Sequence, residues 1–271
     1  MFITCNTLWL PRQSNSIEEY EDAAAPTDTI EKSFDTFQCA VADGAAESSF
    51  SGVWARLLVN GYIERFDLPK LQSDWLNEVA RNKLLWYAEE KAQMGAFAAF
   101  AGLTIYSDKK WEAKAIGDSC IVQVRNMKII QSMPLTDASQ FNNTPFLLSS
   151  NEQSNKNIEN FWVTAKGTWK PHDVFLLMTD ALAMWLLSGQ DNHENMFAQL
   201  LNFDKTRVEY LLELTDQNSF VEFIEQQRSH PDNNYRMKND DVTLMKVAVT
   251  TRVDVTTGSP KKRKQKSQLI Y

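Results

Sequence analysis

The sequence predicts a single α+β domain with mainly antiparallel strands. Short apolar runs separated by polar turns are typical of strands, and two longer stretches carry apolar residues at helical spacing. The 271 residues contain neither an internal repeat nor a Pro/Gly-rich linker that would divide the body of the chain. A chain of this length can bury one large core. We therefore expect one domain over residues 1–252.

The first half contains one predicted strand and two predicted helices. Residues 36–42 (TFQCAVA) form an apolar run that is typical of a buried strand. Apolar residues then recur at helical spacing in residues 50–63, with Ser48 or Ser49 as the expected N-cap. A second helix is expected over residues 74–94.

Consecutive short strands follow. We expect them at residues 98–106, 111–116 and 119–124. The polar turn at residues 107–110 predicts a hairpin, and hence antiparallel pairing, between the first two. Residues 131–160 are rich in Asn, Ser, Gln and Thr, which indicates an exposed loop or insertion.

The last third alternates strands and helices. An apolar run at residues 174–179 indicates a strand that leads directly into a short helix at 181–187. Residues 197–228 carry further amphipathic helix, and residues 242–250 (VTLMKVAVT) form a final strand. Residues 253–271 are a basic tail that we expect to be disordered.

Charge and composition exclude several classes. The net charge is −7 although five of the last eleven residues are Lys or Arg, so the body is more acidic still and is not expected to bind nucleic acid. The tail could contact an anionic surface or act as a nuclear import signal, but a solvated terminus is the simpler interpretation. No apolar run reaches the roughly 20 residues that a membrane span needs.

Cysteine usage and the N-terminus indicate the cytoplasm. Cys5, Cys39 and Cys120 are odd in number and form no CxxC motif, so they predict neither a zinc knuckle nor a disulfide framework. The first ten residues lack the basic start of a signal peptide. A reducing compartment is the default for such a chain.

Acidic residues stand where predicted strands end or begin. Asp43 and Asp180 each follow an apolar strand, and Asp240 and Asp241 precede the last one. Neighbouring strand ends would bring the carboxylates together, and oxygen ligands without His or Cys suit Mg²⁺ or Mn²⁺. Each Asp alone is equally a turn residue.

Five short segments in this order resemble the metal-dependent serine/threonine protein phosphatases of type 2C. They extend over nearly the whole chain, and each has a suitable strand or turn context. The segments are Glu21-Asp22, Asp43-Gly44, Gly117-Asp118-Ser119, Thr179-Asp180-Ala181 and Asp240-Asp241.

The resemblance implies a four-layer α-β-β-α sandwich of two stacked, mainly antiparallel sheets, with a dinuclear metal site at one end. It implies that residues 131–160 correspond to the family's variable flap. It also implies that Asp43 bridges two ions and that Asp118 helps to hold a third, weaker one, with Asp43 and Asp22 central to catalysis. The full set of implied metal ligands is Glu21, Asp22, Asp43, Gly44, Asp118, Asp180 and Asp240.

The activity implied by the resemblance is hydrolysis of phosphoserine and phosphothreonine in proteins. A water bound between two Mg²⁺ or Mn²⁺ ions would attack phosphorus. The expected protein is a cytoplasmic signalling enzyme. We expect it to be a monomer whose partner is a phosphorylated protein substrate.

Two departures from the family keep other functions open. Ala45 follows Gly44 where many members have a His-Gly-Gly or Met-Gly-Gly continuation, and Ile17 stands where the family's phosphate-binding arginine is expected, with Arg12 the nearest candidate. Ala181 for glycine and Asp241 for asparagine are milder changes. A phosphatase-like module that binds a partner with weak or no turnover is the first alternative, and a small-molecule phosphohydrolase is the second.

Overall fold

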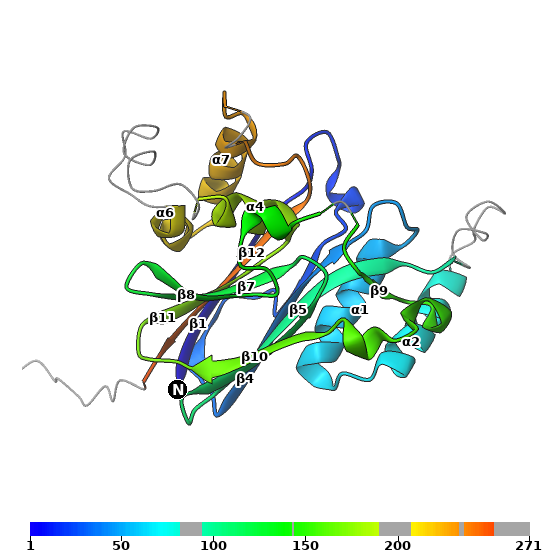
Figure 1. Cartoon of the computed structure of the whole chain (residues 1–271), viewed down its shortest axis with the longest axis horizontal. Coiled ribbons are helices and arrows are strands. Elements are labelled where there is room, and N and C mark those ends of the chain that lie inside the picture. Colours follow the sequence, from blue (N-terminus) through cyan, green and yellow to red (C-terminus); the bar gives the residue numbers. More distant parts are fainter. Residues whose placement is uncertain (82–93, 143, 190–206, 233–235, 252–271) are drawn as a thin grey trace, which may run out of the picture.

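Two stacked sheets with helices on both outer sides form the fold (Figure 1). The computed structural model describes residues 1–81, 94–142, 144–189, 207–232 and 236–251. Every strand pair is antiparallel, which agrees with the hairpins predicted from the short apolar runs. The predicted four-layer α-β-β-α sandwich is therefore confirmed.

The first sheet joins the two ends of the domain. The first and last strands pair along their whole length, from Phe2 opposite Thr250 to Leu10 opposite Val242. The strands lie in the order β3 (Ile30–Ser33), β1 (Phe2–Leu10), β12 (Val242–Thr250), β11 (Asp173–Met178), β7 (Cys120–Arg125) and β8 (Lys128–Met133).

The second sheet is built around two long antiparallel strands. Its central strands pair from Thr36 opposite Tyr106 to Gly44 opposite Ala98. The strands lie in the order β10 (Val163–Thr168), β6 (Lys110–Ile116), β5 (Phe97–Tyr106), β4 (Thr36–Gly44) and β2 (Ala23–Ala25), with β9 (Leu148–Ser149) also paired to β5.

Apolar side chains fill all three interfaces between the four layers. Phe37 and Leu103 of one sheet meet Phe175 and Met245 of the other in the central core. Each large side chain buried in this way contributes about 1.5–3 kcal/mol relative to exposure. The outer layers are α1 (Ser51–Glu64) and α2 (Leu68–Ala80) on the β4–β5 sheet, and α4 (Asp180–Leu187), α6 (Arg207–Glu213) and α7 (Gln217–Arg228) on the β11–β12 sheet.

The start of the first helix differs from the prediction. Phe50, not Ser48 or Ser49, is the residue before α1, and it has a left-handed backbone with φ 60° and no side-chain cap. Ser48 instead donates to the Ala45 carbonyl over 2.9 Å and accepts from the Phe97 amide over 3.2 Å. The serine therefore stabilises the loop after β4 instead of the helix.

Two further helix predictions change in extent. The second helix begins at Leu68, because Asp67 caps it by accepting from the Lys70 amide, and it ends at Ala80. Residues 82–93 of that prediction lie outside the described residues. Of the amphipathic stretch 197–228, the described part forms two helices, α6 and α7, and the second begins after the Asp216 N-cap.

Residues 131–160 are less exposed than predicted. Leu148 and Ser149 are fully buried because β9 pairs with the first two residues of β5. Buried Asn155 joins this core by donating to the Ser149 carbonyl over 2.8 Å. The segment also contains the short 3-10 helices η2 (Ala138–Gln140), η3 (Glu152–Asn155) and η4 (Ile158–Asn160).

None of the helices in the described ranges has both the length and the apolar character that crossing a membrane requires. The basic tail predicted at residues 253–271 lies outside those ranges.

Candidate metal centre

The pairing registers bring the predicted acidic segments to one end of the sandwich. Met178, the last residue of β11, pairs with Leu244 near the start of β12 and with Cys120 at the start of β7. The residues just outside these three strand ends are Asp180, Asp240 and Asp118, so they must be neighbours. In the other sheet Ala23 pairs with Ala42, which places Asp22 beside Asp43.

The electrostatics of Asp43 show how closely these carboxylates gather. Burial raises the pKa of Asp43 well above its ordinary value, and the neighbouring charges of four other aspartates raise it further. Those four are Asp22, Asp180, Asp118 and Asp240. Five of the predicted site residues therefore form one mutually repelling group, referred to below as the aspartate cluster.

Asp22 is held in place by two hydroxyl groups. Thr243 Oγ1 donates to Asp22 Oδ2 over 2.7 Å, and because that donation uses its only hydrogen, the Tyr20 hydroxyl donates to Thr243. Burial is the largest cause of the raised pKa of Asp22. Its other oxygen, Oδ1, is buried without a hydrogen-bond partner among the described residues.

Asp118 lies at the edge of the aspartate cluster. It is buried, and burial raises its pKa to about 7, with further contributions from Asp180 and Asp240. The positive charge of Lys238 acts in the opposite direction.

Glu21 lies to one side of the cluster. Its carboxylate accepts a hydrogen bond from the Ser51 hydroxyl at the start of α1. Its backbone amide donates to Asp241 Oδ2 over 2.7 Å, while the Arg12 amide donates to Asp241 Oδ1 over 2.7 Å. Asp241 therefore fastens the segment after β1 to the turn before β12.

Gly44 is required by a close approach of three backbone segments. A Cβ at this position would lie 2.6 Å from the Glu21 carbonyl oxygen and 2.8 Å from the Ser51 carbonyl carbon. Any larger residue would push Glu21 away from β4. The glycine thus sets the spacing between the Glu21-Asp22 segment and Asp43.

Lys238 binds two of the predicted ligands at once. Its ammonium nitrogen lies 2.9 Å from Asp180 Oδ2 and 2.7 Å from Asp240 Oδ2. Asp180 stands at the N-terminus of α4, where the helix dipole also favours a negative charge. Lys238 thus places a positive charge on this side of the aspartate cluster.

The chemistry of the cluster fits hard divalent cations. The donors are all oxygen atoms, their charges repel one another, and Asp22 Oδ1 lacks a partner. In the described part of the chain, no three His, Cys, Asp or Glu side chains already have the arrangement of a formed metal site. The contacts of Asp180 and Asp240 with Lys238, and of Glu21 with Ser51, hold three of the carboxylates in other positions.

Family membership follows from the sequence and agrees with this geometry. The family model for protein phosphatase 2C matches residues 19–223. This range contains four of the five acidic segments and most of both sheets. The chain belongs to the protein phosphatase 2C family.

Solved structures of other phosphatases share the fold. The Staphylococcus aureus serine/threonine phosphatase Stp1 is 12% identical with a TM-score of 0.53, covering 91% of this chain and 95% of that one. The Mycobacterium tuberculosis serine/threonine phosphatase PstP/Ppp is 13% identical with a TM-score of 0.51, covering 93% and 100%. The photosystem II phosphatase PBCP is 15% identical with a TM-score of 0.51, covering 92% and 99%. A comparison with curated proteins gives no match.

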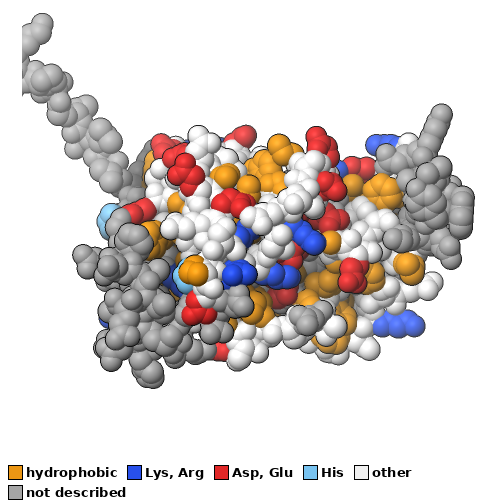
Figure 2. Space-filling view, turned by 90° about the horizontal axis from the view of Figure 1, so that it is seen from above, with side chains coloured by type: hydrophobic (Ala, Val, Ile, Leu, Met, Phe, Trp, Pro, Cys, Tyr) orange, Lys and Arg blue, Asp and Glu red, His pale blue; other side chains and the backbone are white. Residues whose placement is uncertain are grey.

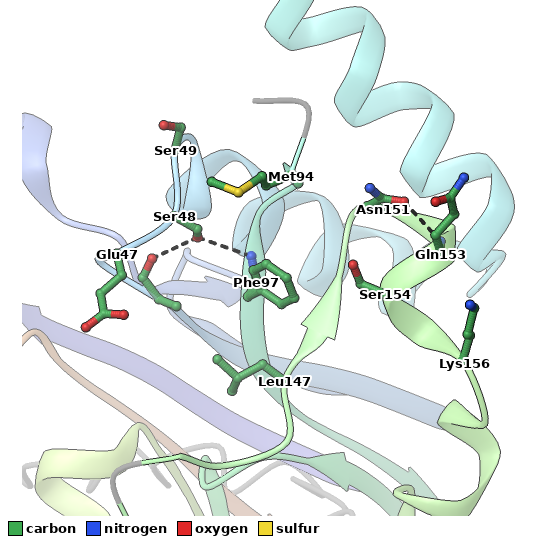
Figure 3. Close-up of a pocket in the computed structure, with 12 residues that line it drawn as sticks. Glu47, Ser48, Ser49, Met94, Phe97, Leu147, Asn151, Gln153, Ser154 and Lys156 are labelled. Carbon is green, nitrogen blue, oxygen red and sulfur yellow. Dashed lines mark hydrogen bonds between the residues drawn. The ribbon is translucent and has the colours of Figure 1, made fainter. Parts of the chain in front are cut away.

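Within this phosphatase 2C fold, a pocket lies beside the loop that follows Asp43 and Gly44. Its volume is about 720 Å³, and the loop after Gly44 forms one wall while residues 151–156 form another. Figure 3 shows Glu47 and Lys156 on opposite sides of the pocket, with Phe97 and Leu147 between them. The pocket therefore offers opposite charges at its two ends and apolar surface in the middle.

The face that carries the upper loops of Figure 1 mixes charges of both signs. Figure 2 shows acidic and basic side chains interspersed over its described part, with apolar side chains among them. The acidic residues are therefore not one uniform negative surface, in agreement with the contacts of Lys238.

Three features of this phosphatase 2C site were missed by sequence reasoning. Thr243 stands two residues after Asp241, and this position could have marked it as a partner of a buried carboxylate. Asp241 carries two backbone hydrogen bonds and is more than a mild replacement for asparagine. Lys238 has no spacing signal, because its pairing with Asp180 depends on the tertiary fold.

Proposed function

We propose that this protein is a Mg²⁺- or Mn²⁺-dependent phosphatase that hydrolyses phosphoserine and phosphothreonine in proteins. The observation that carries the proposal is the aspartate cluster, in which burial and the charges of four neighbouring aspartates, from the ends of both sheets, raise the pKa of Asp43. Such a concentration of buried negative charge is costly unless cations offset it. Membership of the phosphatase 2C family supports the same chemistry.

The residues proposed to hold the ions are those predicted from the sequence. Asp43 is central, since all the other aspartates of the cluster surround it. When bound, two such ions would lower the pKa of a water for attack on phosphorus and offset charge on the phosphoryl oxygens. The proposed ligands are Glu21, Asp22, Asp43, Gly44 through its carbonyl, Asp118, Asp180 and Asp240.

The chain's own residues keep this site in shape. Thr243 and Tyr20 fix one oxygen of Asp22, which leaves Oδ1 free to bind a cation. Asp241 and Gly44 fix the backbone of Glu21 against β4. These contacts fix one oxygen of Asp22 and the backbone of Glu21 in the absence of an ion.

We further propose that the pocket in Figure 3 accepts the residues that flank the phosphorylated side chain. Its two charged ends, Glu47 and Lys156, would favour a peptide with charges of opposite sign along its length. Lys156→Glu should then reverse the preference between phosphopeptides with acidic and basic residues at that end. The rate of p-nitrophenyl phosphate hydrolysis should stay the same, because this small substrate does not extend to Lys156.

The test of the proposed function is hydrolysis against a Mn²⁺ titration. We expect release of phosphate from p-nitrophenyl phosphate and a phosphothreonine peptide, with Asp43→Asn lowering kcat/KM at least a hundredfold. Asp108→Asn makes the same chemical change in an exposed hairpin turn and should leave the rate unchanged. Unchanged metal-dependent hydrolysis in Asp43→Asn would reject the proposal.

A binding module without turnover is the second candidate function. The pairing of Lys238 with Asp180 and Asp240 favours it, as does the exposure of Ile17 where the family's phosphate-binding arginine is expected. Stable binding of the phosphothreonine peptide with no phosphate release at any Mn²⁺ concentration would support this alternative. Hydrolysis of nucleotides or sugar phosphates, but not of phosphopeptides, would instead identify a small-molecule phosphohydrolase.

A further inference from the structure

Lys238 is placed at the aspartate cluster as a cation would be. Its ammonium lies between the carboxylates of Asp180 and Asp240, within 2.9 Å of an oxygen of each. These two residues come from different parts of the chain, one after β11 and one before β12. A single positive charge thus joins both strand ends on this side of the cluster.

The pairing differs from the other ion pairs of the surface. In the pairs Arg56–Glu78 and Lys110–Asp108, both side chains are more than a third exposed. The Asp180 and Asp240 side chains are 16% and 31% exposed, whereas the lysine is 55% exposed. The carboxylates are therefore partly withdrawn from water, while the lysine has room to move away into solvent.

A divalent cation that binds Asp180 and Asp240 must displace this ammonium. Both need the same carboxylate oxygens, and the like charges of the ammonium and the ion repel each other at this separation. Binding of the ion therefore includes the cost of breaking two contacts to Lys238. In the described part of the chain, the remaining aspartates of the cluster, Asp22, Asp43 and Asp118, form no ion pair with Lys238.

We propose that Lys238 is a built-in competitor of the metal ion at Asp180 and Asp240. It holds the two carboxylates together in the metal-free protein and weakens the affinity of this side of the centre for Mg²⁺ or Mn²⁺. Occupancy then depends on the cation concentration. The inference rests on the metal centre of the proposed function.

The test is isothermal titration calorimetry of the full chain with MnCl₂. Lys238→Met and Lys238→Gln remove the charge, and Lys238→Arg keeps it as the matched control. We expect both neutral variants to bind Mn²⁺ at one site about tenfold more tightly than wild type, which corresponds to about 1.4 kcal/mol. Lys238→Arg should bind like wild type. Equal or weaker Mn²⁺ binding by both neutral variants would overturn the proposal.

Thermal unfolding gives a second readout that does not require activity. Without metal, the neutral variants should unfold at a lower temperature, because Asp180 and Asp240 lose their counter-charge. With saturating Mn²⁺ their Tm should rise more than that of wild type, in proportion to the tighter binding. An equal Mn²⁺-induced rise in all four proteins would contradict the inference.

The outcomes separate this inference from the proposed function. Tighter Mn²⁺ binding by the neutral variants, with no phosphate release from wild type, would support the role of Lys238 and reject the phosphatase. Phosphate release by wild type, with identical Mn²⁺ affinities in all variants, would support the phosphatase and reject the role of Lys238. Absence of Mn²⁺ binding in wild type and every variant would overturn both.

Discussion

Thr243 Oγ1 donates a hydrogen bond to Asp22 Oδ2 over 2.7 Å, and so joins two residues that are 221 positions apart in the chain. The contact links the start of β12 to the residue directly before β2, and thus one sheet to the other. The geometry of the aspartate cluster therefore depends on residues that are not themselves ligands.

Removing the Thr243 hydroxyl should destabilise the protein. Thr243→Val keeps the shape of the side chain but removes the hydrogen bond that buried Asp22 Oδ2 accepts, at a cost of about 1–3 kcal/mol. Thr243→Ser keeps the hydroxyl and loses one methyl group, worth about 1 kcal/mol. Urea unfolding of the metal-free proteins measures the loss of unfolding free energy in each variant. A Thr243→Val protein as stable as wild type would show that the hydrogen bond adds nothing.

Asp241→Asn should also lower the free energy of unfolding, by about 1 kcal/mol. The asparagine has one acceptor oxygen for the two amides of Arg12 and Glu21, so one of them loses its partner. Lower repulsion within the acidic group offsets part of the loss. The control is Asp216→Asn at the N-cap of α7, where either residue caps well. If both variants unfold at the same denaturant concentration, the double contact is not stabilising.

Gly44→Ala should be among the more damaging small changes in the chain. The added methyl would press on two backbone groups at 2.6 and 2.8 Å, and we expect a loss of about 1–3 kcal/mol. Gly52→Ala is the matched control, because its Cβ would stay at least 3.3 Å from its neighbours and alanine favours the helix. Thermal unfolding of both variants would show the contrast, and a Gly44→Ala protein as stable as Gly52→Ala would contradict the close approach.

Lys114 should make stability depend on pH in the alkaline range. Burial lowers its pKa to about 8. The ring centroids of Phe66 and Trp162 lie 3.5 and 4.8 Å from its ammonium nitrogen, and these rings favour the charged form. Above pH 8 the unfolded chain binds more protons than the folded one, so wild-type stability rises with pH towards the ordinary lysine pKa.

The measurement is the difference in unfolding free energy between wild type and Lys114→Met at pH 7 and pH 10. Between pH 7 and pH 10 the unfolding free energy of wild type should rise by about 1 kcal/mol relative to that of the variant, after allowance for solvent screening. Lys166→Met, on the exposed edge strand β10, is the control for general effects of pH. A difference that stays constant with pH would contradict the prediction.

The sequence was sufficient for the strand ends that carry the aspartates. The apolar runs that end near Asp43 and Asp180, and the one that starts after Asp241, coincide with β4, β11 and β12 to within two residues. Each run is buried on both faces, so its hydrophobic pattern is strong and its polar boundary is clear. The convergence of the carboxylates follows from those boundaries once the strands pair.

Other elements depend on contacts distant in the chain. Strand β1 has Thr4 and Asn6 within it, so its pattern is weak, and its central place in the sheet comes from pairing with β12. Phe50, the residue before α1, has a left-handed backbone that no capping rule indicates. Lys238 meets Asp180 only in the folded protein, and no local spacing could reveal it.

The pairing of β1 with β12 has a consequence for biosynthesis. Residues 1–10 are translated more than 200 residues before residues 242–250, yet these strands are neighbours in the first sheet. Asp22 and Asp241 likewise depend on contacts between early and late segments. A nascent chain interrupted before residue 240 would hold four aspartates of the cluster but would lack Asp240 and the Thr243 hydroxyl that binds Asp22. The complete cluster therefore forms only after residues 240–243 have been translated.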